Sequence, residues 1–158
     1  MHSAIFIILV AFLCNAPQVE ARCRSLGPRC SFGWHLWGNS CYLMTDSDYG
    51  WVKAGDECRK LGGVLAVPHS PEEDDFIKTF THGSLVWIGC NDRAREGNWE
   101  CEEGGVRISY RNWDLSRRQP ELSLQDCAAM SADTQGWHDR HCAERNYAIC
   151  KRPRVNYR

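Results

Sequence analysis

Two different spacings of apolar residues mark the first predicted strand and helix. Asn39 to Thr45 has the pattern of a strand, with Tyr42 and Met44 on one face. A helix is predicted next, because four apolar residues recur at steps of three or four: Trp51, Ala54, Cys58 and Leu61. Gly62-Gly63 then ends the helix, since glycine readily takes the left-handed conformation that closes one.

The second predicted helix has a strong start signal. It follows a short strand at Val64–Val67. Ser70 is the expected N-cap, Pro71 suits the first helical position, and Glu73 is placed to complete a capping box. The buried side of this helix is expected to carry three aromatic or aliphatic residues: Phe76, Ile77 and Phe80.

Beyond residue 84 the pattern changes to short apolar runs. Four strands are predicted there, at residues 85–88, 98–101, 126–130 and 147–151. A polar stretch from Arg111 to Gln125 separates the second strand from the third. Two early helices and later short strands around a long loop indicate a single α+β domain.

The N-terminus has the features of a secretory leader. The apolar run Ala4–Cys14 is too short to cross a bilayer, and Val19-Glu20-Ala21 offers the small residues that a signal peptidase reads. We therefore expect a secreted, extracellular protein without a membrane span. The predicted parts are a signal peptide at 1–21, a short lead-in at 22–29, the domain at 30–151 and a basic tail at 152–158.

Cysteine content and charge narrow the function. Nine cysteines follow the leader, and with no CxxC pair among them they indicate disulfides and not a zinc site. Because nine is odd, one thiol is free or bonds another chain. Without the leader, which contains Glu20, the chain has 19 basic and 19 acidic residues, so no overall field attracts nucleic acid. No Gly-x-Ser-x-Gly elbow occurs, and an enzyme is not expected.

An ordered set of short motifs resembles the C-type lectin domain family over residues 30–151. The motifs are Trp87-Ile88-Gly89, Asn91-Asp92, Asn112-Trp113, Trp137-His138-Asp139 and Ile149-Cys150-Lys151. The resemblance implies a disulfide-rich C-type-lectin-like fold, with two helices, short antiparallel sheets and a long loop. It also implies that glycans or glycoproteins are the binding partners.

The resemblance further implies a set of disulfides. The family pattern pairs Cys30 with Cys41, Cys58 with Cys150, and Cys127 with Cys142. Cys90 and Cys101 stand where the family usually has bulky apolar residues, and their joint presence suggests a fourth bridge. Cys23 is left over, and an interchain bond that gives a homodimer is preferred to a free thiol.

Calcium is the cofactor that the resemblance implies, bound in the long loop. Gln119-Pro120-Glu121 resembles the family's ligand triplet, and Asp139 matches a carboxylate ligand. His138 replaces an Asn and Gln125 replaces a Glu, which leaves fewer hard, charged oxygens for the ion and predicts weak binding. The predicted carbohydrate and calcium site therefore comprises Gln119, Glu121, His138 and Asp139.

An auxiliary metal position is also only partly kept. Asp92, Glu96 and Asp126 match it, but Leu122 stands where an acid is often found. His138 and His141, three residues apart, are a further candidate pair for zinc or copper.

Two alternatives to calcium-assisted glycan binding remain open. One is calcium-independent recognition of a protein or of a sulfated, acidic ligand, for which four arginines lie in or near the long loop: Arg107, Arg111, Arg117 and Arg118. The other is binding to ice or mineral surfaces, which also occurs on this fold. Trp113 and Trp137 are expected to be core residues in preference to sugar-stacking platforms.

Overall fold

The computed structural model describes residues 30–116 and 124–155 of the chain. Several predictions lie outside these residues: the signal peptide and lead-in with Cys23, the Gln119-Pro120-Glu121 triplet with Leu122, Arg117 and Arg118, and the end of the basic tail.

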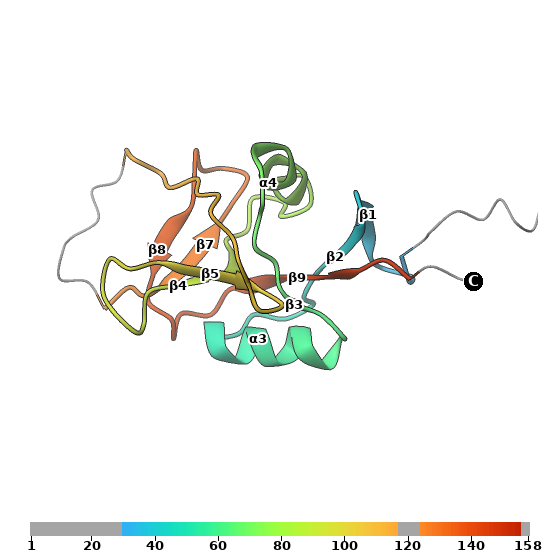
Figure 1. Ribbon diagram of the computed structural model, residues 1–158, viewed down its shortest axis with the longest axis horizontal. Helices are drawn as coiled ribbons and strands as arrows, with labels where there is room; N and C mark the ends of the chain where they lie inside the picture. The colour runs from blue at the N-terminus through green and yellow to red at the C-terminus, as the bar shows by residue number, and fades with distance from the viewer. Residues whose placement is uncertain (1–29, 117–123, 156–158) are drawn as a thin grey trace, which may run out of the picture.

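Two helices and nine strands form within the described residues (Figure 1). In chain order they are β1 (His35–Trp37), β2 (Ser40–Met44), α3 (Trp51–Lys60), β3 (Val64–Leu65), α4 (Pro71–Lys78), β4 (Val86–Asn91), β5 (Glu100–Glu103), β6 (Val106–Arg107), β7 (Cys127–Met130), β8 (His138–Arg140) and β9 (Tyr147–Pro153).

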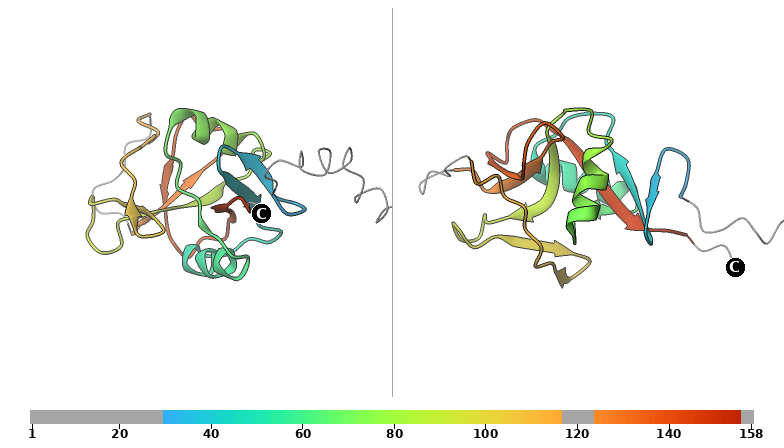
Figure 2. Two further views of the ribbon diagram at one scale, coloured as in Figure 1. Left: turned by 45° about the vertical axis from the view of Figure 1, so that its right-hand side comes forward. Right: turned by 90° about the horizontal axis from the view of Figure 1, so that it is seen from above.

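The strands join in the order β1-β2-β9-β4-β5-β6, while β3 adds to β9 and β7 links β4 to β8. All pairs are antiparallel except β4 with β9, which run parallel. The helices α3 and α4 lie on opposite sides of β9 (Figures 1 and 2). This arrangement confirms the predicted α+β class.

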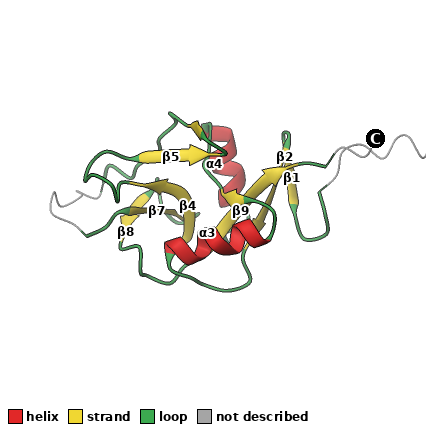
Figure 3. Cartoon of the chain, turned by 60° about the horizontal axis from the view of Figure 1, so that its bottom comes forward, coloured by secondary structure: helices red, strands yellow, loops and turns green. Residues whose placement is uncertain are grey.

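Helix α3 packs on the sheet through Ala54 and Cys58, which are fully buried, as predicted (Figure 3). Leu61 was wrongly predicted to share that face: the helix ends at Lys60, and Leu61 is a solvent-exposed C-cap. The next residue, Gly62, has a φ of 76°, which ends the helix directly after Leu61 and turns the chain away from the helix axis.

Helix α4 begins as predicted at Pro71, and Ser70 Oγ accepts a hydrogen bond from the Glu73 N–H at 3.3 Å. The Glu73 carboxylate, however, accepts from the N–H of His69 at 3.0 Å, one residue before the cap. The predicted capping box is therefore replaced by a contact that directs Glu73 into the interior, where it is 2% exposed.

Three strands were not predicted, and one begins later than expected. Strand β5 starts at Glu100 and not at Asn98, because backbone hydrogen bonds Arg95 N–H to Asp92 O and Asn98 N–H to Arg95 O fold the preceding segment into turns. Strands β1, β6 and β8 have three residues or fewer and form only through pairing with a neighbour. As a result His138 and Asp139 lie on a strand and not on a loop.

The described cysteines form four disulfides. Three are the pairs that the resemblance implied, Cys30–Cys41, Cys58–Cys150 and Cys127–Cys142, and the fourth is the additional bridge suggested by the joint presence of Cys90 and Cys101. Cys58–Cys150 joins α3 to β9 over 92 residues of sequence. Cys90 and Cys101 are opposite each other in the β4–β5 pair. Each bridge restricts the unfolded chain and typically contributes about 2–4 kcal/mol of stability.

The core has two apolar clusters, each containing a fully buried tryptophan. Trp137 packs with the residues between the sheet and α4, such as Ile77 and Ile88. Trp87 packs with Ala54 and Cys58 under α3. The expectation that Trp113 and Trp137 are core residues is confirmed, with Trp113 half-buried and its ring centroid 5.6 Å from that of Trp137.

Candidate functional site

Asp92, which directly follows β4 at the loop end of the sheet, is a buried acid. Its side chain is only 1% exposed. One carboxylate oxygen, Oδ2, accepts the N–H of Gly97 at 2.8 Å, while the buried Oδ1 has no hydrogen-bond partner among the described residues. A buried carboxylate oxygen without a donor carries a desolvation cost that a cation would remove.

Two further acids lie close to Asp92. Its N–H donates to the carbonyl of Asp126 at 3.1 Å, which places the start of β7 beside the end of β4. Burial first, and then the charge of Asp126, raises the pKa of Asp92. Burial and the charges of Asp92 and Asp126 also raise the pKa of Glu96. The sequence-predicted auxiliary acids are thus neighbours that repel one another electrostatically.

The chemistry of these acids fits a hard cation, although their arrangement is not a complete site. Carboxylate oxygens are the ligands that calcium prefers. Yet within residues 30–116 and 124–155, no group of three or more His, Cys, Asp or Glu side chains is arranged to hold a metal ion. The Asp92 oxygen without a partner is therefore the observation that speaks for a cation, and calcium would be held by Asp92 with Glu96 and Asp126.

The predicted sugar-site residues His138 and Asp139 lie on β8 and are both buried. They pair across the sheet with β7, where His138 is opposite Ala129 and Asp139 is opposite Ala128. His138 Nε2 lies 3.8 Å from Asp114 Oδ2, in the first part of the long loop. Gln119 and Glu121, the other two predicted ligands, fall outside the described residues.

Asp114 is a site residue that the sequence analysis missed. It is buried, and its Oδ1 accepts hydrogen bonds from both the N–H and the hydroxyl of Ser116. The only signal in the sequence was an acid directly after Asn112-Trp113 in a polar stretch, which does not reveal that His138 lies opposite.

Backbone pairing joins the start of the long loop to β8. Asp114 N–H donates to the Trp137 carbonyl, and Trp137 N–H donates to the Asn112 carbonyl. Gly136 makes this approach possible, because a Cβ there would lie 2.5 Å from the Asn112 oxygen. Any other residue at this position would push the loop away from the sheet.

Two of the four arginines considered for an acidic ligand, Arg107 and Arg111, lie in the described residues. Arg111 is half-buried, and its guanidinium donates to the backbone carbonyls of Ile108 and Tyr110, each at 2.7 Å, and of Trp99 at 3.2 Å. Burial, together with the charge of Arg107, lowers the pKa of Arg111. Arg107 is exposed and lies 3.8 Å from Glu100. Arg111 therefore fixes loop backbone, which its position in a polar stretch could not show.

Within the described residues, neither helix is long and apolar enough to cross a bilayer. His141, the second residue of the candidate zinc or copper pair, is exposed, and its Nδ1 accepts the N–H of Ala143 at 3.2 Å. It is therefore engaged locally while His138 is buried on β8.

Comparison with known proteins places the fold and the site in context. Residues 47–152 match the family model of the lectin C-type domain. The chain is 31% identical over 133 residues to C-type lectin domain family 4 member M of Hylobates lar, covering 82% of this chain and 33% of that protein. It is 26% identical over 154 residues to the galactose-specific lectin nattectin of Thalassophryne nattereri, covering 94% of each.

The structure is also similar to a solved structure of a calcium-independent type II antifreeze protein. The TM-score is 0.73 at 28% sequence identity, covering 83% of this chain and 99% of the other. The chain spans about a third of the length of the family 4 member M relatives. The protein belongs to the C-type lectin domain family, whose members bind ligands and are not enzymes.

Proposed function

We propose that this C-type lectin domain protein is a secreted recognition protein that binds glycans through its long-loop face, with calcium held weakly. The observation that carries the proposal is the buried Asp92 oxygen without a partner, with Glu96 and Asp126 as like-charged neighbours. Such a cluster is stabilised by a cation. The galactose-specific relative supports a sugar as ligand.

The proposed sugar contacts are Gln119, Glu121, His138 and Asp139, of which the structure describes His138 and Asp139 on β8. Only Glu121 and Asp139 of this set carry a negative charge, so weak calcium binding is expected. High extracellular calcium concentrations would still occupy such a site. The chain covers about a third of the family 4 member M proteins, and the partners of those whole proteins are not carried over to it.

Calcium titration of the purified protein by calorimetry tests the proposal, followed by a glycan array with and without chelator. Binding in the millimolar range and chelator-sensitive sugar signals are expected. An Asp139→Asn variant should lose the sugar signal, while Asp75→Asn, which changes an exposed acid on α4, should keep it. Sugar signals that survive the chelator would refute the calcium-assisted mechanism.

A second candidate function is calcium-independent recognition of a protein or of an acidic, sulfated ligand. The observation in its favour is that His138 is buried against Asp114, in a position where calcium would need an oxygen ligand. The similarity to a calcium-independent antifreeze protein supports it. In that case calorimetry would detect no heat of calcium binding, and the protein would still bind its ligand in the presence of chelator.

We also propose removal of residues 1–21 and a homodimer linked through Cys23. The support is the odd cysteine count: the eight described cysteines form four disulfides, which leaves Cys23 after the leader. The intact mass of the secreted protein should correspond to two chains that each begin at Arg22, and reduction should give the mass of one chain. A monomer mass without reductant would reject the dimer.

A further inference from the structure

A cleft of about 420 Å³ lies between α3 and the β4–β5 hairpin, apart from the residues of the proposed glycan site. Helix α3 contributes Trp51, Gly55 and Arg59 to its lining, and β5 contributes Glu100 and Glu102. Figure 1 shows β5 above α3, with the turn after β5 reaching toward β3. The volume falls in the range of small-molecule binding sites.

Gly55 leaves part of this cleft open. Glycine in the middle of a helix costs about 1 kcal/mol relative to alanine. No steric conflict requires it, because a Cβ at Gly55 would meet the Arg59 guanidinium at 3.5 Å and a Leu65 methyl at 3.7 Å, both ordinary contacts. At Gly63, by contrast, a Cβ would lie 2.7 Å from the Lys151 oxygen. Gly63 is needed for packing, whereas Gly55 only preserves space.

The walls of the cleft carry opposite charges. Arg59 and Arg93 contribute guanidinium groups, and Arg93 also lies 5.8 Å from the centroid of the Trp51 ring. Glu100 and Glu102 are two residues apart on β5 and so point to the same face. Within the described residues no ion pair joins these arginines to these glutamates: Arg59 pairs with Asp56 and Glu100 lies 3.8 Å from Arg107. The opposite charges are therefore separated by the space of the cleft.

The floor between these walls is apolar. It is formed by Val64 and Leu65 of β3, with the half-buried Trp51 at one end. A ligand that matches all three surfaces needs one carboxylate, one ammonium group and an apolar body. A guanidinium group binds a carboxylate through charge-assisted hydrogen bonds, and a glutamate does the same for an ammonium group.

We propose that the cleft binds a short zwitterionic peptide with free ends and apolar side chains. Its carboxyl end lies toward Arg59 and Arg93, its amino end toward Glu100 and Glu102, and its side chains on Val64 and Leu65. This site acts independently of the glycan site, because it shares none of the residues proposed for calcium or sugar.

The test uses the ¹⁵N-labelled mature protein and the dipeptide Leu-Leu in two forms, with free ends and with both ends blocked as N-acetyl-Leu-Leu-amide. The free form should shift amide resonances of α3 and β5, with roughly tenfold higher affinity than the blocked form. Equal affinity of both forms, shifts confined to other elements, or no shifts at the solubility limit of the peptide would overturn the proposal.

Variants separate binding from folding. Gly55→Ala places a methyl group in the cleft and should weaken Leu-Leu binding roughly tenfold, while the melting temperature stays equal or rises because alanine favours the helix. Arg59→Gln should reduce the preference for a free carboxylate, with Arg93 left as the remaining guanidinium group. Lys60→Gln, the neighbouring charge change outside the cleft lining, should bind as the wild type does. Unchanged binding by Gly55→Ala, in a protein that folds, would refute the site.

Discussion

Two buried carboxylates, Glu73 and Asp92, differ sharply in what surrounds them. Glu73 is 2% exposed, and it accepts hydrogen bonds from the Tyr42 hydroxyl and from the Lys151 ammonium group at 2.8 Å. Asp92 is 1% exposed, yet one of its oxygens has no donor among the described residues. Its charged neighbours, Asp126 and Glu96, have the same sign.

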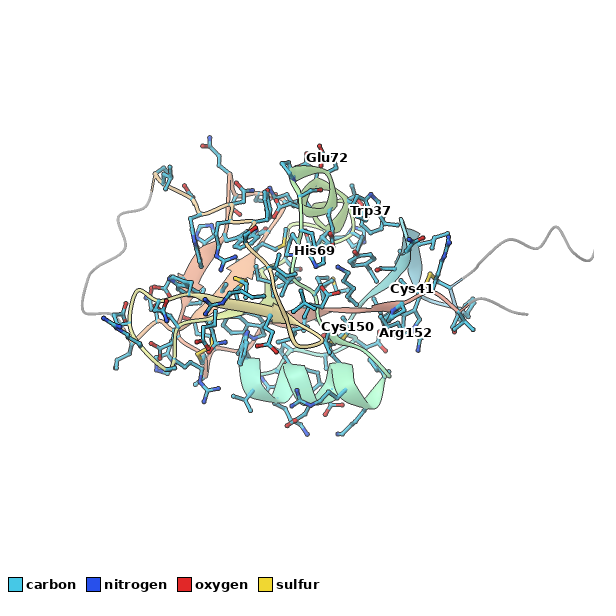
Figure 4. All side chains as sticks on the ribbon, in the orientation of Figure 1. Trp37, Cys41, His69, Glu72, Cys150 and Arg152 are labelled. Carbon is cyan, nitrogen blue, oxygen red and sulfur yellow. A yellow bond between two sulfur atoms is a disulfide. The ribbon has the colours of Figure 1, made fainter. Side chains whose placement is uncertain are left out.

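The Glu73 network is a closed one. Lys151 also lies 2.9 Å from Glu103 and 3.3 Å from His69 Nε2. Figure 4 shows His69 between α4 and β9, whereas Glu72 lies at the far side of α4. Burial, and then the bond to Glu73, raises the pKa of Tyr42, so the phenol stays a neutral donor. The network therefore joins β2, α4, β5 and β9 without needing a ligand.

The contrast shows that the partners of a buried carboxylate, and not its burial alone, indicate its role. A buried carboxylate with an ammonium partner and several donors is part of the structure. A buried carboxylate with an unmet oxygen and like-charged neighbours is a candidate site for a cation. Three measurements test this distinction.

The largest effect is expected at Lys151. The Lys151→Met variant leaves Glu73 buried without its cation, which should cost about 3–5 kcal/mol of unfolding free energy. Urea unfolding, followed by tryptophan fluorescence, measures the loss. The double variant Glu73→Gln with Lys151→Met is the matched control and should recover most of it. A single-variant loss below about 1 kcal/mol would show that Glu73 does not depend on Lys151.

A smaller effect of opposite sign is expected at Asp92. Asp92→Asn keeps an acceptor for the Gly97 N–H but removes the charge, so the stability in chelator should be unchanged or rise by about 1 kcal/mol. The gain in melting temperature on adding calcium should disappear. Asp75→Asn on α4 serves as the control for a lost exposed charge. If calcium still raises the melting temperature of Asp92→Asn, the ion binds elsewhere.

The smallest effect concerns pH. Burial and Asp126 raise the pKa of Asp92, so the folded state binds this proton more tightly than the unfolded state does. The ionised Asp92 carboxylate lowers the stability of the folded state at pH values above the raised pKa, and this cost is relieved as the pH falls through that pKa. In chelator, the stability advantage of Asp92→Asn over the wild type should therefore shrink on acidification.

Protons and calcium compete for the same carboxylates, so the calcium-induced gain in melting temperature of the wild type should also decrease as the pH falls. Thermal unfolding in chelator and in calcium, at stepped pH, measures both trends. A calcium-induced increase in melting temperature that does not change with pH would contradict a role for Asp92 and Glu96 as ligands.

Much of the local structure could be predicted from short-range rules. The start of α4 depends on Ser70 and Pro71, and the end of α3 on Gly62, because each acts within one helical turn. The neighbourhood of Asp92 and Asp126 was predictable only through the family motifs. Leu61, by contrast, was misassigned, since periodicity does not tell at which residue a helix ends.

The remaining errors have a common physical cause, which is pairing between distant segments. Strand β8 exists because His138 and Asp139 pair with β7, although nothing in three residues has the pattern of a strand. Arg111 was considered as a contact for an acidic ligand, and its guanidinium donates to backbone carbonyl groups that the loop brings close. Asp114 lies opposite His138 only because Gly136 allows the loop to approach.

Residue types at fixed short spacings were enough to predict the family, the two helices, the Ser70 cap of α4 and the disulfide pairs that the motifs imply. The tertiary structure decided which charges are compensated. Glu73 meets Lys151 across 78 residues of sequence. Asp92 meets Asp126 between two strands, and within residues 30–116 and 124–155 its Oδ1 has no hydrogen-bond donor. Compensation depends on distances between segments remote in the chain, and no local pattern contains them.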